Sequence, residues 1–399
     1  MVKSLTGKSI VEIIKAHRGQ CLFSDDGLEL EYEDLVENIE EFGKQLSSID
    51  MENNKICALV LPNGVDMAIS FLALANFVTV SPLNPNYTKE EFLFFLEDLN
   101  CEFIITDNNA SDSLLEAAKQ LKIKLFYLNN YSPKNRLSIK SLSTTSKCWL
   151  DQNKADDICL ILHTSGTTSR PKQVQLSCMN IISSALNIAR VLQLEKKDKG
   201  MNIMPLFHIH GLIASLFSSI VTGSSVVCTS GFNALTFYGN IKNFKPSWIT
   251  AVPTMYQAIL SRASRNKEII QASNLRLLRS SSAAMPVATI EALENAFQCP
   301  VIESYGMTEA SHQMASNFLD STRKPGSVGK SAGPEIALLR DNKLISVANT
   351  VGEIIIRGSN VTKGYKNNNK ANKENFFDGW FKTGDLGKFD EDGFLFISG

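Results

Sequence analysis

The sequence predicts an α/β fold, in which helices cover parallel β-sheets, followed by a small part made of antiparallel strands. Short apolar runs alternate with segments of helical spacing through most of the chain, which is typical of βαβ units. From about Lys324 the sequence pattern changes to short strand-like runs separated by Gly, Asn and Asp. This pattern favours a small antiparallel barrel or sheet. A chain of 399 residues, 44% of them apolar, can form two or three such parts.

Alternating elements are predicted one by one through the first half of the chain. Leu35, Ile39, Phe42 and Leu46 recur at helical spacing, so they indicate an amphipathic helix. Short apolar runs that end at Pro or Gly are typical of buried strands. On these grounds we predict helices at 32–46, 67–76 and 90–99 and strands at 56–61, 77–80, 103–106 and 158–162.

The second half repeats this pattern and then changes. Strands are predicted at 226–229, 248–252, 275–279 and 301–303, and shorter ones at 336–339 and 352–357, with an exposed loop or helix start at 367–375. These elements predict two Rossmann-like parallel-sheet subdomains with helices packed on them and a small β-barrel-like subdomain. Their expected bounds are 1–175, with a phosphate loop at its end, then 176–323 and 324–399.

The composition excludes several classes of protein. A net charge of −1 argues against binding to nucleic acid or to anionic membranes. The longest apolar stretches are too short or too interrupted to span a bilayer, and the N-terminus lacks an apolar signal core. The eight cysteines are scattered without a CxxC pair or zinc spacing, which is the usage of a reducing compartment and predicts a cytoplasmic protein.

The segment His163–Lys172 is the most informative stretch of the sequence. It reads His-Thr-Ser-Gly-Thr-Thr-Ser-Arg-Pro-Lys directly after the predicted strand 158–162. Hydroxyl groups and free backbone N–H groups on a tight loop after a strand suit phosphate oxygens, and two cations follow to neutralise them. The spacing does not match the P-loop of NTPases, which needs a second glycine before the lysine. The alternative is a Ser/Thr-rich surface turn.

Two further segments carry candidate functional side chains. His208 and His210 lie in Pro-Leu-Phe-His-Ile-His-Gly, on the same side if that segment is extended. The segment Ser304–Glu309 offers an aromatic ring, a hydroxyl and a carboxylate, which could stack a base, bind a phosphate and hold Mg²⁺. The alternatives are histidines hydrogen-bonded within the core and a Tyr-Gly turn with a surface glutamate.

Arg279 and Asp385 are the remaining candidate functional residues. Leu275, Leu277 and Arg279 share one face of a predicted strand. A cation at the end of an apolar face requires an anion, either a protein carboxylate in a salt bridge or an anionic substrate. Asp385 lies in a turn context, where a lone aspartate is usually structural.

Taken together and in this order, these segments resemble the core motifs of the acyl-adenylate-forming superfamily. That group includes acyl- and aryl-CoA synthetases, luciferases and the adenylation domains of peptide synthetases. The resemblance covers essentially the whole chain, and it is carried by His163–Lys172, Pro205–Gly211, Tyr305–Glu309 and Thr383-Gly384-Asp385. The Ser-Arg pair at 169–170 and a histidine three residues after Glu309 are most similar to the oxalate–CoA ligase branch.

The resemblance implies an ATP-dependent ligase that uses Mg²⁺ and CoA. A carboxylate attacks the α-phosphorus of ATP, and the thiol of CoA then attacks the acyl-AMP. Residues implied to act in catalysis are Thr308, Glu309, His208 and Lys172, with Glu309 as the Mg²⁺ ligand. Residues implied to bind nucleotide are Thr164, Ser165, Gly166, Thr167, Thr168, Ser282, Ala283, Ala284, Glu303, Ser304, Tyr305, Gly306, Met307 and Asp385.

The acid substrate expected from this branch is oxalate or another short dicarboxylate. The second carboxylate needs its own donors, and the candidates are Arg279, His210, Ser281 and His312. Alternatives are an adenylation module that loads a carrier protein, and a degenerate protein that only binds nucleotide.

Two departures from the family pattern accompany the resemblance. Gln173 stands where the family usually has glycine, and in a left-handed backbone it would cost roughly 1–2 kcal/mol. The sequences of other superfamily members also continue beyond the position that corresponds to Gly399. They add a mobile C-terminal domain, which carries a lysine used in adenylation. Because this domain is absent from the sequence, the chain is expected to bind nucleotide but to be impaired in turnover.

Overall fold

The computed structural model describes residues 7–48, 55–132, 136–140, 150–164 and 171–398. The chain forms two compact units. The first contains 1–179, 205–208 and 228–230, and the second contains 180–204, 209–227 and 231–399. The sequence-based bounds at 175/176 and 323/324 belong to a finer, three-part division, which stays a prediction.

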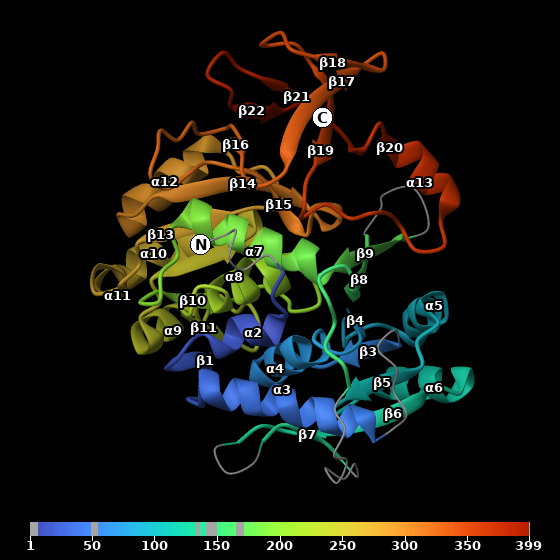
Figure 1. The fold of residues 1–399 in the computed structure, drawn as a ribbon. Helices are drawn as coiled ribbons and strands as arrows, with labels where there is room; N and C mark the ends of the chain where they lie inside the picture. Colours follow the sequence, from blue (N-terminus) through green and yellow to red (C-terminus); the bar gives the residue numbers. More distant parts are fainter. Residues whose placement is uncertain (1–6, 49–54, 133–135, 141–149, 165–170, 399) are drawn as a thin grey trace. The chain divides into compact units, whose positions relative to one another are not determined.

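The first unit is a sheet with helices packed on it (Figure 1). Its strands run in the order β7-β6-β5-β3-β4-β8-β9, and the central pairs are parallel, whereas β6/β7 and β8/β9 are antiparallel. The strands β1 and β2 form an antiparallel hairpin outside this sheet. The elements are α2 (Ile10–Lys15), β1 (Gln20–Ser24), β2 (Glu29–Glu31), α3 (Tyr32–Ser47), β3 (Ile56–Val60), α4 (Val65–Leu74), β4 (Thr79–Pro82), α5 (Lys89–Leu99), β5 (Phe103–Thr106), α6 (Asp112–Leu121), β6 (Lys124–Asn129), β7 (Ser138–Ile139), β8 (Ile158–His163) and β9 (Gln173–Ser177).

Local sequence signals explain where these elements begin and end. The helix α5 begins after a capping box, in which the Thr88 hydroxyl accepts from the Glu91 amide and the Glu91 carboxylate accepts from the Thr88 amide. It ends at Asn100 in a left-handed conformation, which asparagine tolerates better than most residues. Its apolar side packs with α6 against β3 and β5, around fully buried residues such as Phe92 and Ile104.

The second unit contains a mixed sheet and a separate antiparallel sheet. In the mixed sheet the order is β16-β15-β14-β13-β12-β10-β11; β10, β12, β13 and β14 are parallel, and β15 and β16 are antiparallel. The elements up to β16 are α7 (Cys178–Leu192), β10 (Lys199–Asn202), the π-helix η1 (His210–Phe217), α8 (Ser218–Ile220), β11 (Ser225–Cys228), α9 (Phe237–Phe244), β12 (Trp248–Ala251), α10 (Pro253–Ala263), η2 (Ser264–Asn266), α11 (Lys267–Gln271), β13 (Leu277–Ser280), α12 (Val287–Phe297), β14 (Val301–Met307), η3 (Thr308–Ala310), β15 (His312–Ser316) and β16 (Lys330–Ser331).

The antiparallel sheet holds the last part of the chain. Its order is β18-β17-β19-β21-β20, and β22 pairs with β21. The elements are β17 (Glu335–Arg340), β18 (Lys343–Ile345), β19 (Gly352–Arg357), α13 (Asn369–Asn375), β20 (Phe376–Phe377), β21 (Trp380–Phe389) and β22 (Leu395–Ile397). The predicted fold class, parallel sheets covered by helices plus a small β-barrel-like part, is therefore confirmed, with antiparallel strands added at the sheet edges.

Two local expectations are wrong. The segment from Tyr305 to Met307 continues strand β14 instead of forming a Tyr-Gly turn. The segment around His208 and His210 is not extended, because His208 closes a turn on Pro205 and His210 begins η1. Strand alternation therefore does not place these two histidines on one side.

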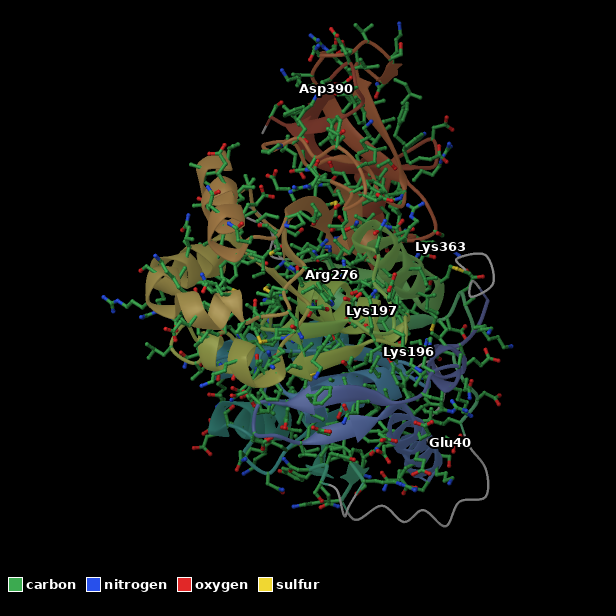
Figure 2. All side chains as sticks on the ribbon, turned by 90° about the vertical axis from the view of Figure 1, so that its left-hand side faces the viewer. Glu40, Lys196, Lys197, Arg276, Lys363 and Asp390 are labelled. Atoms are coloured by element: carbon green, nitrogen blue, oxygen red, sulfur yellow. The ribbon has the colours of Figure 1, made fainter. Side chains whose placement is uncertain are left out.

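Charged side chains such as Glu40 in the first unit and Asp390 in the second are labelled in Figure 2. Within the described part of the chain, no helix has the length and hydropathy needed to cross a membrane. The described cysteines are buried and form no disulfide with one another; Cys148 lies outside the described residues.

Candidate active site

The predicted phosphate-binding residues that can be placed lie in the first unit at the loop end of the hairpin β8/β9, where β8 ends and β9 begins. The Thr164 amide donates to the Lys172 carbonyl at 3.0 Å, and the Lys172 amide donates to the Thr164 hydroxyl at 3.3 Å. The two residues are thus brought together. Ser165, Gly166, Thr167 and Thr168 lie outside the described residues. His208 is exposed in a turn of the same unit, with its ring against Phe207.

Gln173 does not carry the backbone strain considered from the sequence. It is the first residue of β9 and lies opposite His163 in the antiparallel ladder. It is not among the residues with positive φ. An extended backbone accepts any side chain, so glutamine causes no penalty of that kind here.

The predicted nucleotide-binding residues of the second unit lie at the carboxyl ends of β13 and β14. These neighbouring parallel strands pair Ser280 with Glu303, and ligands of open α/β sheets bind at such strand ends. The loop after β13 exposes Ser282, Ala283 and Ala284. On the strand ends themselves, the Ser281 hydroxyl donates to the Ser304 carbonyl at 3.0 Å.

The strand β14 brings its aromatic residue to an acid from far along the chain. The hydroxyl of Tyr305 donates to the carboxylate of Asp385 on β21. Burial, and then the hydrogen bond to Asp385, raise the pKa of the Tyr305 hydroxyl above its ordinary value. Two residues predicted to bind adenine and ribose are therefore neighbours, although 80 positions separate them.

Gly306 allows β14 to approach β15 very closely. A Cβ at this position would lie 1.6 Å from the carbonyl oxygen of His312, a distance that no side chain permits. Ser311, directly before β15, and His312, its first residue, have φ of 50° and 91°. Such values cost roughly 1–3 kcal/mol for a non-glycine residue and are typical of functional sites.

The predicted magnesium ligand is held in place from two sides. Glu309 follows Thr308 in the short helix η3 and is 6% exposed. Its Oε1 accepts a hydrogen bond of 2.8 Å from the Tyr365 hydroxyl, and its backbone carbonyl accepts one of 2.7 Å from the Thr362 amide. Tyr365 could not be identified as a partner from the sequence, because it lies 56 residues away from Glu309.

Arg279 lies at the centre of a buried polar cluster in the second unit. Its guanidinium is fully buried and donates to the Thr250 hydroxyl at 3.1 Å and to the Gln313 side-chain oxygen at 2.9 Å. The His312 Nδ1 lies 3.4 Å from Arg279 Nη2. Among the described residues no carboxylate pairs with Arg279, so none of them provides the salt bridge considered from the sequence.

His210 closes this cluster on the other side. Its Nε2 lies 2.7 Å from the Thr250 hydroxyl and its Nδ1 lies 3.0 Å from the Ser282 hydroxyl. Its ring meets the ring of His312 edge to face, with centroids 4.8 Å apart. The structure therefore brings together three of the four predicted substrate residues, Arg279, His210 and His312. Thr250 and Gln313 are members that the sequence did not suggest.

Protonation in the cluster follows from its burial. Burial lowers the pKa of Arg279 to about 9, so it remains charged at neutral pH. Burial, the charge of Arg279 and His210 lower the pKa of His312 well below its ordinary value, so this ring is neutral. Because its Nδ1 faces an arginine donor, we assign the proton of His312 to Nε2.

Three buried nitrogens of the cluster have no hydrogen-bond partner among the described residues. They are the Nε of Arg279, the Nε2 of His312 and the Nε2 of Gln313. With the proton assignment above, all three are donors. Buried donors without acceptors are costly, and a charged ligand with several oxygens would satisfy them.

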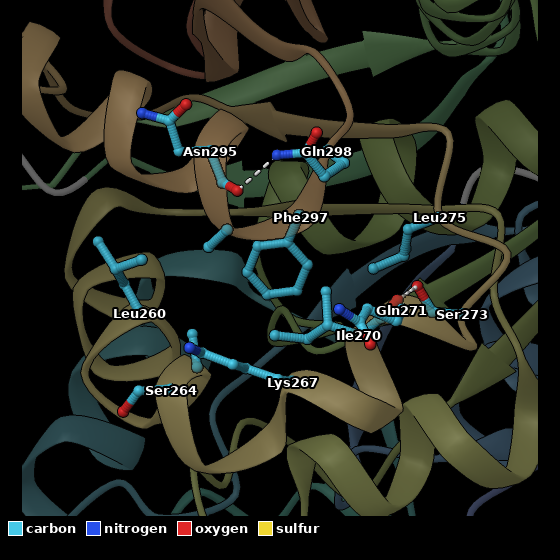
Figure 3. A pocket seen from close by; sticks show the side chains of 12 residues that line it. Leu260, Ser264, Lys267, Ile270, Gln271, Ser273, Leu275, Asn295, Phe297 and Gln298 are labelled. Carbon is cyan, nitrogen blue, oxygen red and sulfur yellow. Dashed lines mark hydrogen bonds between the residues drawn. The ribbon is translucent and has the colours of Figure 1, made fainter.

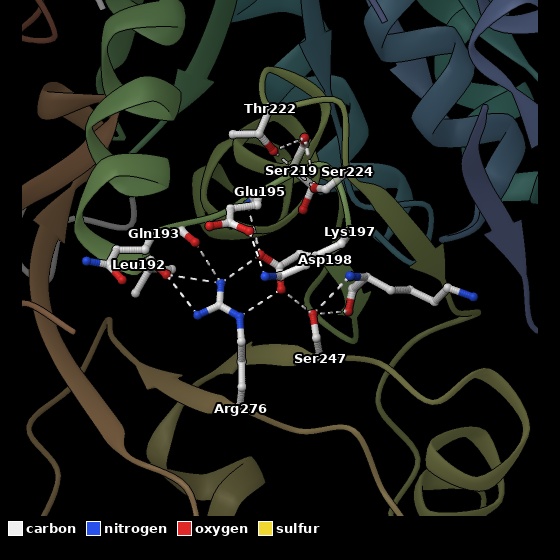
Figure 4. A network of polar contacts seen from close by, with 11 residues as sticks. Leu192, Gln193, Glu195, Lys197, Asp198, Ser219, Thr222, Ser224, Ser247 and Arg276 are labelled. Carbon is white, nitrogen blue, oxygen red and sulfur yellow. Dashed lines mark hydrogen bonds and ion pairs between the residues drawn. The ribbon is translucent and has the colours of Figure 1, made fainter. Parts of the chain in front are cut away.

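Arg276, a second arginine in this region, has its charge and its donors satisfied by other residues of the protein. Arg276 donates to both carboxylate oxygens of Asp198 at 2.7 Å and also to the carbonyls of Leu192 and Gln193 (Figure 4). Burial by itself raises the pKa of Asp198, but the hydrogen bonds from Arg276 reverse this and lower it. Arg276 is therefore neutralised within the protein, in contrast to Arg279.

A separate cavity of about 830 Å³ lies between α10, α11 and the end of α12 (Figure 3). Ile270 and Phe297 are buried in its lining, and Lys267 stands at its edge. None of the predicted site residues lines this cavity. This cavity is therefore a different place from the candidate site at the strand ends described above.

Glu303 makes the stability of the protein dependent on pH. Burial raises the pKa of this carboxyl to about 7, and the hydrogen bond from the Gly326 amide only partly opposes the shift. The folded state then holds a proton that the unfolded state releases above about pH 4.5, so the free energy of unfolding falls as pH rises from about 4.5 to 7. The upper bound of this loss is on the order of 3 kcal/mol.

Glu303→Gln is expected to remove that part of the pH dependence. The measurement is the urea midpoint of both proteins at about pH 5 and pH 8, since a change in midpoint at constant slope reports stability. The wild type should lose more stability than the variant between the two pH values. Equal losses would show that Glu303 is not protonated in the folded protein.

Known proteins resemble this chain along most of its length. The family model described as AMP-binding enzyme matches residues 14–366. The oxalate–CoA ligase of Arabidopsis thaliana is 42% identical over 374 residues, which cover 92% of this chain and 72% of that protein. The oxalate–CoA ligase of Saccharomyces cerevisiae is 39% identical over 372 residues, covering 86% of this chain and 67% of that protein.

A solved structure agrees with these relatives. The O-succinylbenzoate coenzyme A synthetase of Bacillus subtilis, in complex with ATP and a magnesium ion, superposes with a TM-score of 0.82 at 28% identity. The match covers 98% of this chain and 79% of that one. Sequence motifs, fold and these matches agree: the chain belongs to the AMP-binding enzyme family, the acyl-adenylate-forming superfamily that its motifs resemble.

Proposed function

We propose that this chain forms the nucleotide- and acid-binding part of an ATP-dependent acid–CoA ligase, and that its acid is oxalate or another short dicarboxylate. The buried cluster around Arg279 is the observation that carries the choice of acid. Within the described part of the chain, it combines a buried arginine that meets no carboxylate with three nitrogens that have no hydrogen-bond partner. An arginine fork suits a carboxylate in two-point fashion.

The cluster also disfavours other acids. A monoacid with an apolar chain would leave the unpartnered donors buried without acceptors, and such sites reject analogues that lack the hydrogen-bonding group. The relatives named oxalate–CoA ligase support the same choice. His210, which bridges Thr250 and Ser282, would then hold the edge of the acid site next to the exposed loop proposed to wall the adenine.

The reaction assigned to the chain has two balanced steps. One carboxylate oxygen of the acid bonds to the α-phosphorus of ATP, and pyrophosphate leaves. The CoA sulfur then bonds to the acyl carbon, its proton is released, and AMP leaves. Tyr305 and Asp385 would bind adenine and ribose, and Thr308 would donate to the α-phosphate. Thr164 and Lys172 would bind the outer phosphates.

Magnesium fits the residues present. It takes one or two carboxylates and completes its shell with phosphate oxygens and water, and Glu309 is a buried carboxylate fixed by the Tyr365 hydroxyl. When bound, the ion would neutralise phosphate charge during attack of the acid. The meeting of all these residues around one ATP molecule stays a proposal.

The test is a substrate panel with the full-length protein. Pyrophosphate release and thioester formation are measured with oxalate, malonate and succinate, and with glyoxylate as a match for oxalate that lacks the second carboxylate. We expect oxalate or malonate to exceed glyoxylate by about a hundredfold or more in kcat/KM. A preference for long-chain monoacids would remove the dicarboxylate assignment. Acyl transfer to a carrier protein but not to CoA would remove the CoA assignment.

A further inference from the structure

The loop end of the hairpin β8/β9, where β8 ends and β9 begins, is held to helix α5 by one carboxylate. Asp98 lies in the last turn of α5, and its side chain is 17% exposed. Its Oδ2 lies 3.2 Å from His163 Nε2 and accepts a hydrogen bond of 2.8 Å from Gln173 Nε2. Gln173 Nε2 also donates to the Asp98 backbone carbonyl at 2.6 Å.

The two partners of Asp98 face each other across the hairpin. His163 and Gln173 form a pair in the antiparallel register of β8 and β9. The next residues outward are Thr164 and Lys172, which are joined by two hydrogen bonds. A single carboxylate, that of Asp98, thus contacts both strands directly next to Thr164 and Lys172, the two residues proposed to bind phosphate.

Packing reinforces this arrangement. The His163 side chain is 6% exposed and its ring meets Phe95 of α5 edge to face, with centroids 4.7 Å apart. Gln173 is likewise buried. Buried hydrogen bonds to a charged group are strong and directional, so they restrict the distance between the two strands at the loop end of the hairpin more than the ladder alone does.

We propose that Asp98, with His163 and Gln173, is a positioning group that fixes Thr164 and Lys172 for the outer phosphates of ATP. The inference rests on the proposed function for what the hairpin binds. None of the three residues needs to touch ATP. Asp98 acts through the hairpin, and its loss allows the two strand ends to separate or to shift in register.

The experiment compares Asp98→Ala with Glu97→Ala in the full-length protein. Glu97 is the adjacent acid on the same helix and is exposed, so it matches the charge change without the contacts. Pyrophosphate release is measured over a range of ATP at saturating acid and over a range of acid at saturating ATP. We expect Asp98→Ala to raise KM for ATP about tenfold or more, while KM for the acid changes by less than about twofold.

A conservative variant separates positioning from folding. Asp98→Asn keeps one acceptor oxygen and is expected to give an intermediate KM for ATP; it also replaces Asp98→Ala if that variant does not fold. A merely structural role predicts instead a lower melting temperature and a lower kcat with an unchanged KM for ATP, and that result would overturn the proposal. An inactive wild type on every acid would count against the proposed function, not against the positioning role.

Discussion

Arg279→Met is expected to lower kcat/KM for the dicarboxylate substrate roughly 30- to 5,000-fold, because truncating one partner of a buried charge pair costs about 2–5 kcal/mol. ATP binding should remain close to that of the wild type, since none of the contacts of Arg279 involves a residue proposed to bind ATP. Stability should be unchanged or higher. An unneutralised buried charge is itself costly, and apolar replacements of buried charges are often stabilising.

The matched control for this variant is Arg276→Met. It removes the same side chain three residues earlier, but it leaves the buried carboxylate of Asp198 without its cation. We expect a loss of stability of about 3–5 kcal/mol and no change in the preference among acids. The measurements are urea unfolding and the acid panel for both variants. An Arg279→Met enzyme that still uses oxalate as well as the wild type would refute the assignment of the acid site.

Thr308→Ala is expected to lower kcat for pyrophosphate release about 10²- to 10³-fold at saturating ATP and acid, because loss of one donor to developing charge costs about 2.7–4 kcal/mol. Thr308 is half-buried at the start of η3, directly after the strand that carries Tyr305. The change removes only the hydroxyl and Cγ2. The fold and the binding of ATP in the ground state should therefore be preserved.

Thr289→Ala provides the comparison for this second variant. Thr289 is a half-buried threonine of helix α12 that is not among the proposed site residues. Single-turnover pyrophosphate release and equilibrium binding of ATP are measured for both variants. Normal adenylation by Thr308→Ala would exclude a role for its hydroxyl in the reaction, whatever its effect on affinity.

Much of the fold could be predicted because a buried strand appears in the sequence as a short run of apolar residues. Runs such as 56–61 and 103–106 are apolar since parallel strands are covered on both faces, and they became β3 and β5. The antiparallel strands β9 and β15 were missed because they lack such a run. Gln173 and Gln313 are polar residues that the fold nonetheless buries.

The candidate site was predictable only where its residues form one continuous motif. Tyr305, Thr308 and Glu309 stand together in the sequence, and so do Thr164 and Lys172. The partners that fix them do not. Tyr365 is bound to Glu309, and Asp385 to Tyr305, by contacts between positions 56 and 80 residues apart, and single-sequence patterns report only near neighbours.

The sequence by itself determined the class of this protein, since the order of its motifs places it among enzymes that bind AMP and since its apolar periodicity specifies parallel sheets. The tertiary structure alone decided what two similar arginines do. Arg276 and Arg279 stand three positions apart in one segment, yet one meets Asp198 and the other meets no described carboxylate. Whether a buried charge is neutralised depends on residues that only folding brings within reach, because electrostatic interactions act through space and not along the chain.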